Sequence, residues 1–557
     1  MTRSVIDPIT RIEGHLRVEM EVENGVVADA WVSGGCFRGM ELVVQNRTPE
    51  DAAQIVERIC GVCPVSHAHA SSIAGDKAYG ITISNNARII RNLLEGAQFL
   101  HSHILWLYNL AALDYVNPLN ALQANVDNAY AVALENGLAL HSDLNQLYDK
   151  LGAFAANGQL SIFSGNWFDA DNGEAYKLTP ELDLILTSHY LEALKMQARA
   201  SEMAALLGGK MPHVMTSIPG GNMWVPTESK LDDLLAMAIE VRDWVNDTVL
   251  ADTVALAGPY AEALTFGKGC GRYIAWGVFE GNGWPYGDNY IEQMKNRYLP
   301  MGVLDENFGV TDVEESKIQE YMGHSWYKGD DTYTSPYFTT DPDYTDYNVD
   351  DRYTWVKCPT YDGKPMEAGS MSRIFAAYVR GVPFIKENVD AVLGILGAQP
   401  GDLSAFQSTL GRTAIRQVET MYVADLMVEW VNELMEAIKG GDSEYFRAPE
   451  RTTGEGSGFW EAPRGALYHS EKVKDGKIEG YQIIIPSTWN LAPINSEGEH
   501  GPLEQALIGV PVADIEKPIN ALRTVHSFDP CTACAVHVTD RATGKSFETV
   551  TSPWGVK

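Results

Sequence analysis

The chain has 557 residues, and its composition, 45% hydrophobic and 21% charged, is that of a folded protein with a substantial core. Its 74 acidic residues outnumber the 42 basic ones, which gives a net charge of -32. This balance argues against nucleic-acid binding, which depends on clustered Lys and Arg side chains.

The N-terminal residues, Met1 to Pro8, lack the apolar core of a signal peptide. The most apolar long stretch, residues 93–113, is interrupted by Glu95 and Gln98 and by two histidines, so it predicts a buried helix instead of a membrane span. We therefore expect a chain that neither crosses a membrane nor carries its own export signal.

The first predicted element is a β-hairpin over residues 16–33, because apolar residues alternate on both sides of an Asn-Gly turn. A helix is predicted over residues 49–58, where Pro49 and acidic residues occupy the first turn. Apolar residues at helical spacing predict longer helices over residues 85–117, 128–156, 180–207, 227–257 and 402–438.

Over residues 258–365 the apolar residues follow neither helical nor strand periodicity, and Gly, Pro, Tyr, Trp and Asp dominate. We predict that this stretch is a long surface excursion, an irregular segment on the outside of the protein held in place by its aromatic side chains. Two later hairpins are indicated, around Asp475-Gly476 and around Thr543-Gly544. The predicted fold class is therefore α+β: one large, mainly helical unit with a central bundle of long helices and small peripheral β-hairpins and sheets.

Four of the seven cysteines form two C-x-x-C pairs, Cys60 with Cys63 and Cys531 with Cys534. Two intervening residues let both thiolates reach one metal, which suits zinc, iron–sulfur clusters and other metals that prefer soft ligands. Almost the whole chain separates the two pairs, whereas a zinc ribbon separates its pairs by about 15–20 residues. If the pairs meet, both termini converge on a metal site at the centre of a large fold.

The flanking residues narrow the choice of metal. The first pair stands in Arg-Ile-Cys-Gly-Val-Cys and is followed by His67; the second stands in Asp-Pro-Cys-Thr-Ala-Cys and is followed by His537. Further landmarks lie before and between them: residues 7–15, 37–41, 324–327, 462–465 and 486–490. In this order the motifs resemble the large subunit of nickel–iron hydrogenases, most closely the membrane-associated or periplasmic uptake group, and the resemblance covers nearly the whole chain.

By this resemblance, the four paired cysteines hold a Ni–Fe(CN)2(CO) centre that cleaves H2 reversibly into protons and electrons. Cys63 and Cys534 would bridge the two metals, and Cys60 and Cys531 would be terminal ligands of nickel. Cys531 would accept the proton. Glu13 would be the first relay outward, because burial raises the pKa of a carboxyl group toward the working range.

The resemblance also assigns roles around the centre. Arg464 would place fixed positive charge beside the open metal position and would be the rival proton acceptor. Asp529 would hold Arg464 through a charge-assisted hydrogen bond. Pro463 and Ser487 match positions that contact the cyanide ligands, and His67 would donate to a bridging sulfur.

Three more features follow from the same resemblance. Ser102 stands where many relatives carry Asp, which would soften the restraint on Arg464. Glu41, the backbone carbonyl of Ile483 and His537 match a second site for Mg2+ or Fe2+. Residues 538–557 match an extension that a maturation protease removes after nickel loading, which leaves residues 1–537 as the hydrogenase domain.

The chain has no further cysteine pairs for an electron relay, so the resemblance implies a small iron–sulfur subunit as partner. That subunit would carry the export signal for the complex. We therefore expect the complex in the periplasm, or at the membrane through the partner subunit; the alternative location is the cytoplasm. Nickel-insertion factors and the maturation protease are the remaining expected partners.

Two other functions compete with catalysis. The same fold serves as an H2 sensor with little turnover, or as a metal-free or zinc-holding structural relative. The four paired cysteines argue against the structural alternative, and the C-terminal extension favours the enzyme, because sensor-type relatives usually lack it.

Overall fold

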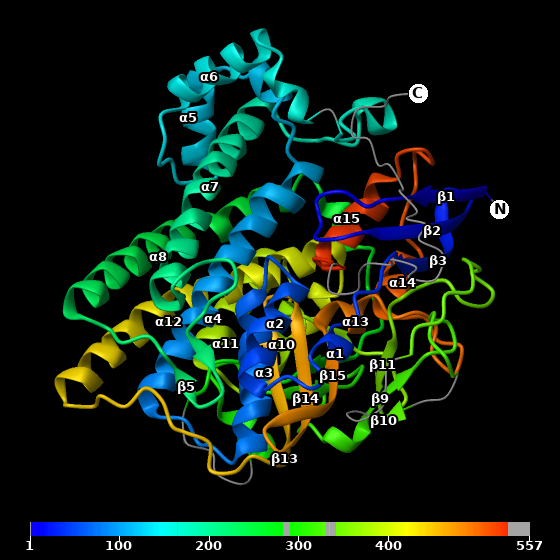
Figure 1. Ribbon diagram of the computed structural model, residues 1–557. Helices are drawn as coiled ribbons and strands as arrows, with labels where there is room; N and C mark the ends of the chain where they lie inside the picture. The colour runs from blue at the N-terminus through cyan, green and yellow to red at the C-terminus, as the bar shows by residue number, and fades with distance from the viewer. Residues whose placement is uncertain (1, 164, 282–289, 330–332, 335–340, 533–557) are drawn as a thin grey trace.

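The computed structural model describes residues 2–163, 165–281, 290–329, 333–334 and 341–532. In this part of the chain, long helices form the centre and small sheets lie around them, as Figure 1 shows. This arrangement confirms the predicted α+β class.

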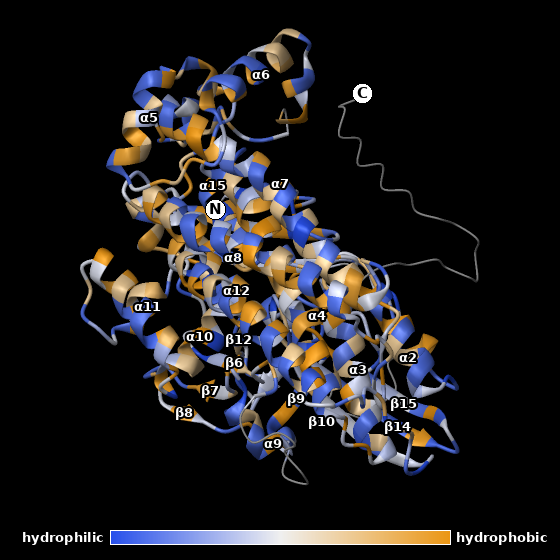
Figure 2. Ribbon diagram, turned by 90° about the vertical axis from the view of Figure 1, so that its left-hand side faces the viewer, coloured by the Kyte–Doolittle hydropathy of each residue, from blue (hydrophilic) through white to orange (hydrophobic). Residues whose placement is uncertain are grey.

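Four long helices cross the centre of the molecule (Figure 2). Each begins after a Ser or Thr whose hydroxyl accepts a hydrogen bond from a backbone N–H of the first turn, which satisfies one of the donors left unpaired there. The four are α4 (Asn85–Ile104), α7 (Pro180–Gly208), α8 (Glu228–Ala257) and α12 (Thr409–Lys439). Helix α4 is buried on nearly every side, so it lacks the polar face of a surface helix.

Two of the predicted long helices differ from the observed ones. Helix α4 ends at Ile104, and a π-helical segment, Leu105–Ala111, follows it directly. The helix predicted over residues 128–156 is two helices, α5 (Val126–Glu135) and α6 (Leu144–Ala156). The chain turns between them at Gly137, whose φ of 65° is left-handed, and the pair projects from the body at the top of Figure 1.

The prediction of a surface excursion over residues 258–365 is wrong. This segment builds most of two small sheets, and Trp276 and Met301 are fully buried. Because its strands are only two to four residues long, they contain too few alternations to form a recognisable pattern. The strands are β6 (Tyr273–Ala275), β7 (Gly302–Leu304), β8 (Val310–Thr311) and β12 (Glu367–Ala368) in one sheet, and β9 (Ile318–Tyr321), β10 (Tyr333–Thr334) and β11 (Cys358–Tyr361) in the other.

The sheet that positions the site consists of β13 (Gly454–Ala462), β14 (Gly465–Lys474) and β15 (Lys477–Ile484). It confirms the hairpin predicted at Asp475-Gly476; the one predicted at Thr543-Gly544 lies outside the described residues. Helix α3 (Pro64–Tyr79) packs directly on β13. A Cβ at Gly456 or Gly458 would lie 2.0 or 1.9 Å from a backbone carbonyl oxygen of α3, so glycine is required for this close approach.

The N-terminal sheet, β1 (Thr2–Ile6), β2 (Leu16–Glu23) and β3 (Val26–Gly34), includes the predicted hairpin. It shares a hydrophobic core with α14 (Pro502–Leu507) and α15 (Ile519–Ser527). The two ends of the described chain therefore fold together, as expected. Six shorter helices and one pair of strands complete the α-helices and strands of the described residues: α1 (Met40–Val43), α2 (Pro49–Val56), α9 (Tyr290–Gln293), α10 (Ser370–Val379), α11 (Pro383–Ile395), α13 (Pro486–Asn490) and the β4–β5 pair (Ser217–Ile218, Gly221–Asn222).

Among the described residues, no helix combines the length and apolar character needed to cross a bilayer.

Candidate metal centre

Three of the four paired cysteines meet in the interior. The Sγ atoms of Cys60, Cys63 and Cys531 all lie within 4.8 Å of one another, and each residue is at most 2% exposed. The Sγ atoms of Cys60 and Cys531 are 3.2 Å apart, well beyond the length of a disulfide bond, about 2.05 Å. Cys534 lies outside the described residues. The cluster offers converging sulfur ligands to one soft metal.

The first pair is held at the junction of two helices. Helix α2, capped by Thr48, and the short 3-10 turn Glu57–Ile59 lead to Cys60. The backbone N–H groups of Val62 and Cys63 donate to Cys60 Sγ, both at 3.3 Å. Cys63 is the N-cap of α3, and the N-terminus of a helix favours negative charge. The local backbone therefore stabilises thiolates at both positions.

Cys531, the first cysteine of the second pair, reaches the site through backbone pairing with the N-terminal segment. The N–H of Thr532 donates to the carbonyl of Glu13 at 2.6 Å, and the N–H of Cys531 donates to Ser487 Oγ at 3.0 Å. This pairing places Glu13 Oε2 3.4 Å from Cys531 Sγ. The structure thus brings the predicted relay carboxyl into contact with the predicted proton acceptor.

Arg464 is 2% exposed and is bound from two sides. Its Nη2 lies 3.0 Å from Asp529 Oδ1, and its Nη1 donates to Ser102 Oγ at 3.3 Å. Burial by itself lowers the pKa of Arg464, but the charges of Asp529 and of the three cysteines raise it well above its usual value. The guanidinium is therefore a fixed positive charge at the cysteine cluster.

Asp529 has a second cationic partner that the sequence did not reveal. Arg416 Nη1 lies 2.7 Å from Asp529 Oδ2, and its guanidinium carbon is 4.1 Å from the centroid of the Trp106 ring. Both arginines are buried, so Asp529 uses one oxygen for each guanidinium. In the sequence, Arg416 is an ordinary residue of a long helix, and no local signal marks it.

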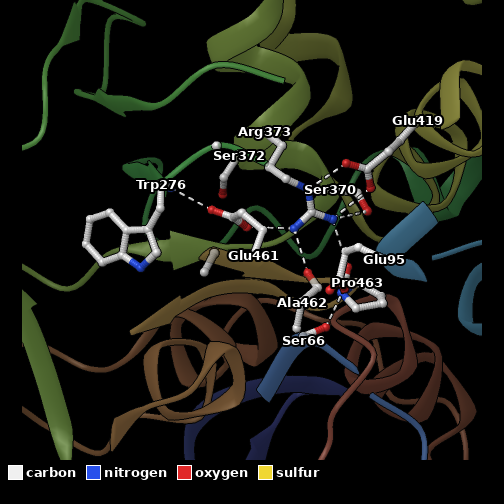
Figure 3. Close-up of polar contacts among 12 residues, drawn as sticks. Ser66, Glu95, Trp276, Ser370, Ser372, Arg373, Glu419, Glu461, Ala462 and Pro463 are labelled. Carbon is white, nitrogen blue, oxygen red and sulfur yellow. Dashed lines mark hydrogen bonds and ion pairs between the residues drawn. The ribbon is translucent and has the colours of Figure 1, made fainter. Parts of the chain in front are cut away.

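A second buried arginine that sequence analysis missed supports the Pro463-Arg464 segment (Figure 3). Arg373, fully buried, donates to the carbonyl of Ala462 at 3.0 Å and to that of Pro463 at 2.8 Å. Its guanidinium also contacts Glu419, at 2.5 and 2.7 Å, and Glu461, at 2.8 Å. Arg373 thus fixes the backbone that leads directly into Arg464.

His67 lies on the first turns of α3, fully buried. Its Nδ1 is 3.1 Å from His469 Nε2, and its Nε2 is buried without a hydrogen-bond partner among the described residues. Burial lowers the pKa of His67 to about 4, so the ring is neutral at pH 7. The unpaired nitrogen leaves one hydrogen-bonding position for a group that the described chain does not supply.

Two of the three residues predicted for the second metal site border one cavity of about 50 Å³. Glu41 and Ile483 both line it, whereas His537 lies outside the described residues. Lys357, which sequence analysis missed, places its Nζ 3.9 Å from Glu41 Oε1 and 4.0 Å from Glu320 Oε1. A carboxylate, a carbonyl and space for water fit a hard divalent cation.

The buried sulfurs, the fixed guanidinium and the unpaired imidazole nitrogen define a metalloprotein whose centre is held by thiolates supplied from both ends of the chain. A protein-family model, described as nickel-dependent hydrogenase, matches residues 38–537 of the chain. A second family model, described as HoxL-like, matches residues 3–33. The chain belongs to the nickel-dependent hydrogenase family.

Characterised relatives extend over nearly the full chain. The hydrogenase-2 large chain of Escherichia coli (strain K12) is 39% identical over 97% of this chain and 97% of its own. The periplasmic NiFeSe hydrogenase large subunit of Desulfomicrobium baculatum is 37% identical, over 97% and 96% of the two chains. The structure of the Ni-Fe-Se hydrogenase from D. vulgaris Hildenborough superimposes with a TM-score of 0.79 at 33% identity, covering 96% of this chain and 100% of that one. These relatives do not favour the zinc-holding structural alternative.

Proposed function

We propose that this chain is the catalytic subunit of a hydrogenase that cleaves H2 reversibly into protons and electrons. The observation that carries this proposal is the convergence of Cys60, Cys63 and Cys531 within 4.8 Å in a chain that matches hydrogenase large subunits almost end to end. When bound, a nickel–iron centre supplies the site at which H2 is polarised and split heterolytically. Cys60, Cys63, Cys531 and Cys534 would hold this centre through their thiolates.

The side chains at the cluster would move the proton and stabilise charge. Cys531 Sγ accepts the proton and passes it to Glu13 Oε2, 3.4 Å away. Arg464, held by Asp529, supplies fixed positive charge without changing its protonation state. The hydroxyl of Ser487, which accepts from the Cys531 N–H, would contact the cyanide ligands of the bound centre together with Pro463.

The electrons would leave through a small subunit that carries iron–sulfur clusters. The hydrogenase-2, uptake and periplasmic proteins that this chain is similar to are named as large chains or large subunits, which supports a heterodimer. The names of the uptake and periplasmic relatives also support a periplasmic or membrane-associated place for the complex. Glu41, the Ile483 carbonyl and His537 would hold Mg2+ or Fe2+ near the C-terminus.

The deciding experiment is metal analysis of the protein purified from its host together with its partner. We expect about one nickel per chain and more iron than the partner's clusters contain, because four thiolates suit a soft metal centre. Cys63→Ser should lose nickel, whereas the control Cys358→Ser, at a buried cysteine of strand β11, should keep it. Zinc in place of nickel in the wild-type protein would contradict the proposal. Nickel without H2 turnover would instead indicate the sensor.

We further propose that residues 538–557 are removed during maturation by a protease that acts after nickel insertion. Intact-mass measurement of nickel-loaded protein should show a chain that ends at His537. Protein made without nickel should keep the full 61.3 kDa chain. A nickel-loaded, active chain of full length would show that the extension is retained.

A further inference from the structure

A side chain joins the N-terminal segment to the C-terminal one, beside the backbone pairing of Glu13 with Thr532. The imidazole of His526, in α15, places its Nε2 2.8 Å from the carbonyl oxygen of Thr10. Thr10 stands a few residues before Glu13 in the sequence, and His526 stands a few residues before Cys531. The segments that bring Glu13 and Cys531 together therefore have a second link, made by the His526 ring.

Both nitrogens of the His526 ring face atoms that can only accept a hydrogen bond. Nδ1 lies 2.5 Å from Asp114 Oδ2, and the oxygen opposite Nε2 is the Thr10 carbonyl. Burial by itself raises the pKa of Asp114, but the charges of Arg11 and His526 outweigh it and lower the pKa to about 2. The Asp114 carboxyl is therefore ionised and has no proton to donate. Both bonds form together only when the ring carries a proton on each nitrogen, as an imidazolium.

Asp114 connects both segments to the helical core. It is fully buried at the end of the 3-10 turn that follows the π-helical segment, and its Oδ1 accepts from Arg11 Nη2. Arg11 Nη1 donates to the carbonyl of Leu110. Arg523, also in α15, donates to the backbone carbonyl of Asp114 at 3.1 and 2.8 Å. One buried carboxylate thus binds a cation from each end of the described chain.

The two segments need such contacts, because each contains a residue other than glycine in the left-handed region. Arg11 has a φ of 55°, and Asp529 has a φ of 51°. Such residues are uncommon and persist where the surrounding contacts hold them. Arg11 is held by Asp114, and the N–H of Asp529 donates to the carbonyl of His526 at 2.9 Å. The same cluster therefore holds the backbone turn that precedes each partner of the relay contact.

We propose that His526 is a positioning residue for proton transfer from Cys531 to Glu13. As an imidazolium, it ties the N-terminal segment to the C-terminal one and so fixes the distance that the proton crosses. Cys531 Sγ and Glu13 Oε2 are 3.4 Å apart, and a displacement of about 1 Å in a reacting pair can lower a rate about 100-fold. This inference rests on the proposed hydrogenase function.

Two amide variants separate the two bonds of His526 in the purified, nickel-loaded complex. A glutamine places its amide nitrogen where Nε2 lies and keeps the bond to the Thr10 carbonyl, whereas an asparagine places its nitrogen where Nδ1 lies and keeps only the bond to Asp114. We expect His526→Asn to lower H2 oxidation about 10- to 100-fold at unchanged nickel content, and His526→Gln to retain most of the wild-type rate. The ratio of the rates in H2O and D2O should rise in His526→Asn, because proton transfer then limits turnover.

His500 provides the matched control. Its ring also lies between two carboxylates, with Nδ1 2.8 Å from Glu504 and Nε2 3.2 Å from Asp29. His500→Asn should therefore keep both the wild-type rate and the wild-type ratio.

A purely structural role would lower nickel content or the thermal midpoint but would leave the H2O/D2O ratio of the loaded enzyme unchanged. An unchanged ratio in His526→Asn would overturn the proposal, and so would equal rates in His526→Asn and His526→Gln. If His526→Asn does not retain nickel, Arg11→Lys decides, because one ammonium cannot reproduce the fork that reaches both Leu110 and Asp114. The ratio should rise in that variant as well, and a wild-type ratio there would overturn the proposal. Absence of nickel from the wild-type complex would instead refute the proposed function itself.

Discussion

The carboxyl of Glu13 lies 3.4 Å from the sulfur of Cys531, although the two residues come from opposite ends of the chain. The contact does not depend on a flexible side chain alone, because the Thr532 N–H donates to the Glu13 carbonyl at 2.6 Å. Backbone pairing therefore sets the position from which this carboxyl can take a proton.

Replacing Glu13 with glutamine should remove the relay while it preserves the shape of the side chain. General acid–base groups contribute about 10²–10⁴-fold to rates, so we expect Glu13→Gln to lower H2 oxidation within that range at unchanged nickel content. Glu23→Gln, at the exposed end of β2, is the matched control. A Glu13→Gln enzyme that turns over at the wild-type rate would exclude Glu13 from the proton path.

Arg464→Lys should keep the positive charge but lose the paired geometry. A lysine ammonium is a point charge and does not reproduce the planar fork that reaches both Asp529 and Ser102. Loss of a fixed electrostatic donor costs about 10²–10³-fold in turnover, which is the decrease we expect in H2 oxidation assays. Arg447→Lys, at an exposed pair with Glu444, should behave as wild type; the same result for Arg464→Lys would rule out a geometric role.

Arg373→Met should destabilise the whole protein, because it leaves Glu419 and Glu461 buried without their cation. Breaking a buried pair by removing one partner costs about 3–5 kcal/mol. The thermal midpoint of the purified complex measures this loss. Arg199→Met, which removes exposed pairs to Glu202 and Glu240, should cost at most about 1 kcal/mol. Equal midpoints for the two variants would show that Arg373 does not stabilise the core.

Stability should also depend on pH through His189, whose Nδ1 is 2.8 Å from Asp252 Oδ2. Burial alone lowers the pKa of His189, but the charge of Asp252 outweighs it and raises the pKa to about 9. Because the folded-state pKa exceeds the unfolded value, about 6.5, the stabilisation is complete below pH 6.5 and is lost as the pH rises through about 9. The thermal midpoint of the wild type should therefore exceed that of His189→Gln at pH 6, and the difference should shrink by pH 9.5. A constant difference would mean that the pair is not ionised.

Much of the candidate site could be predicted because its ligands occur in short motifs. Cys60 and Cys63 are spaced to bind one metal whatever the rest of the chain does, and Asp529 stands beside the second pair. The assignment of Arg464 and Glu13 came from resemblance to a family, and the structure places both at the cluster. Cys534 and His537, outside the described residues, remain predictions.

The supporting residues could not be predicted, because their partners are distant in the chain. Arg416 and Arg373 are single charges inside helical patterns, and nothing near them in sequence distinguishes a buried guanidinium from one in solvent. Helix α3 was also missed: it is buried on nearly all sides and therefore has no apolar stripe.

The sequence by itself determined most of the long helices, the hairpins at Asn24-Gly25 and Asp475-Gly476, and the two cysteine pairs that can bind a metal, because each depends on residues that are neighbours along the chain. The kind of metal centre came from the resemblance to a family. Tertiary structure alone decided which side chains surround that centre. Glycines on β13 let α3 approach the sheet so closely that His67 meets His469, and pairing of the two ends brings Glu13 to Cys531. These contacts depend on how whole elements pack, and packing is set by the combined shape of surfaces that are far apart in the sequence.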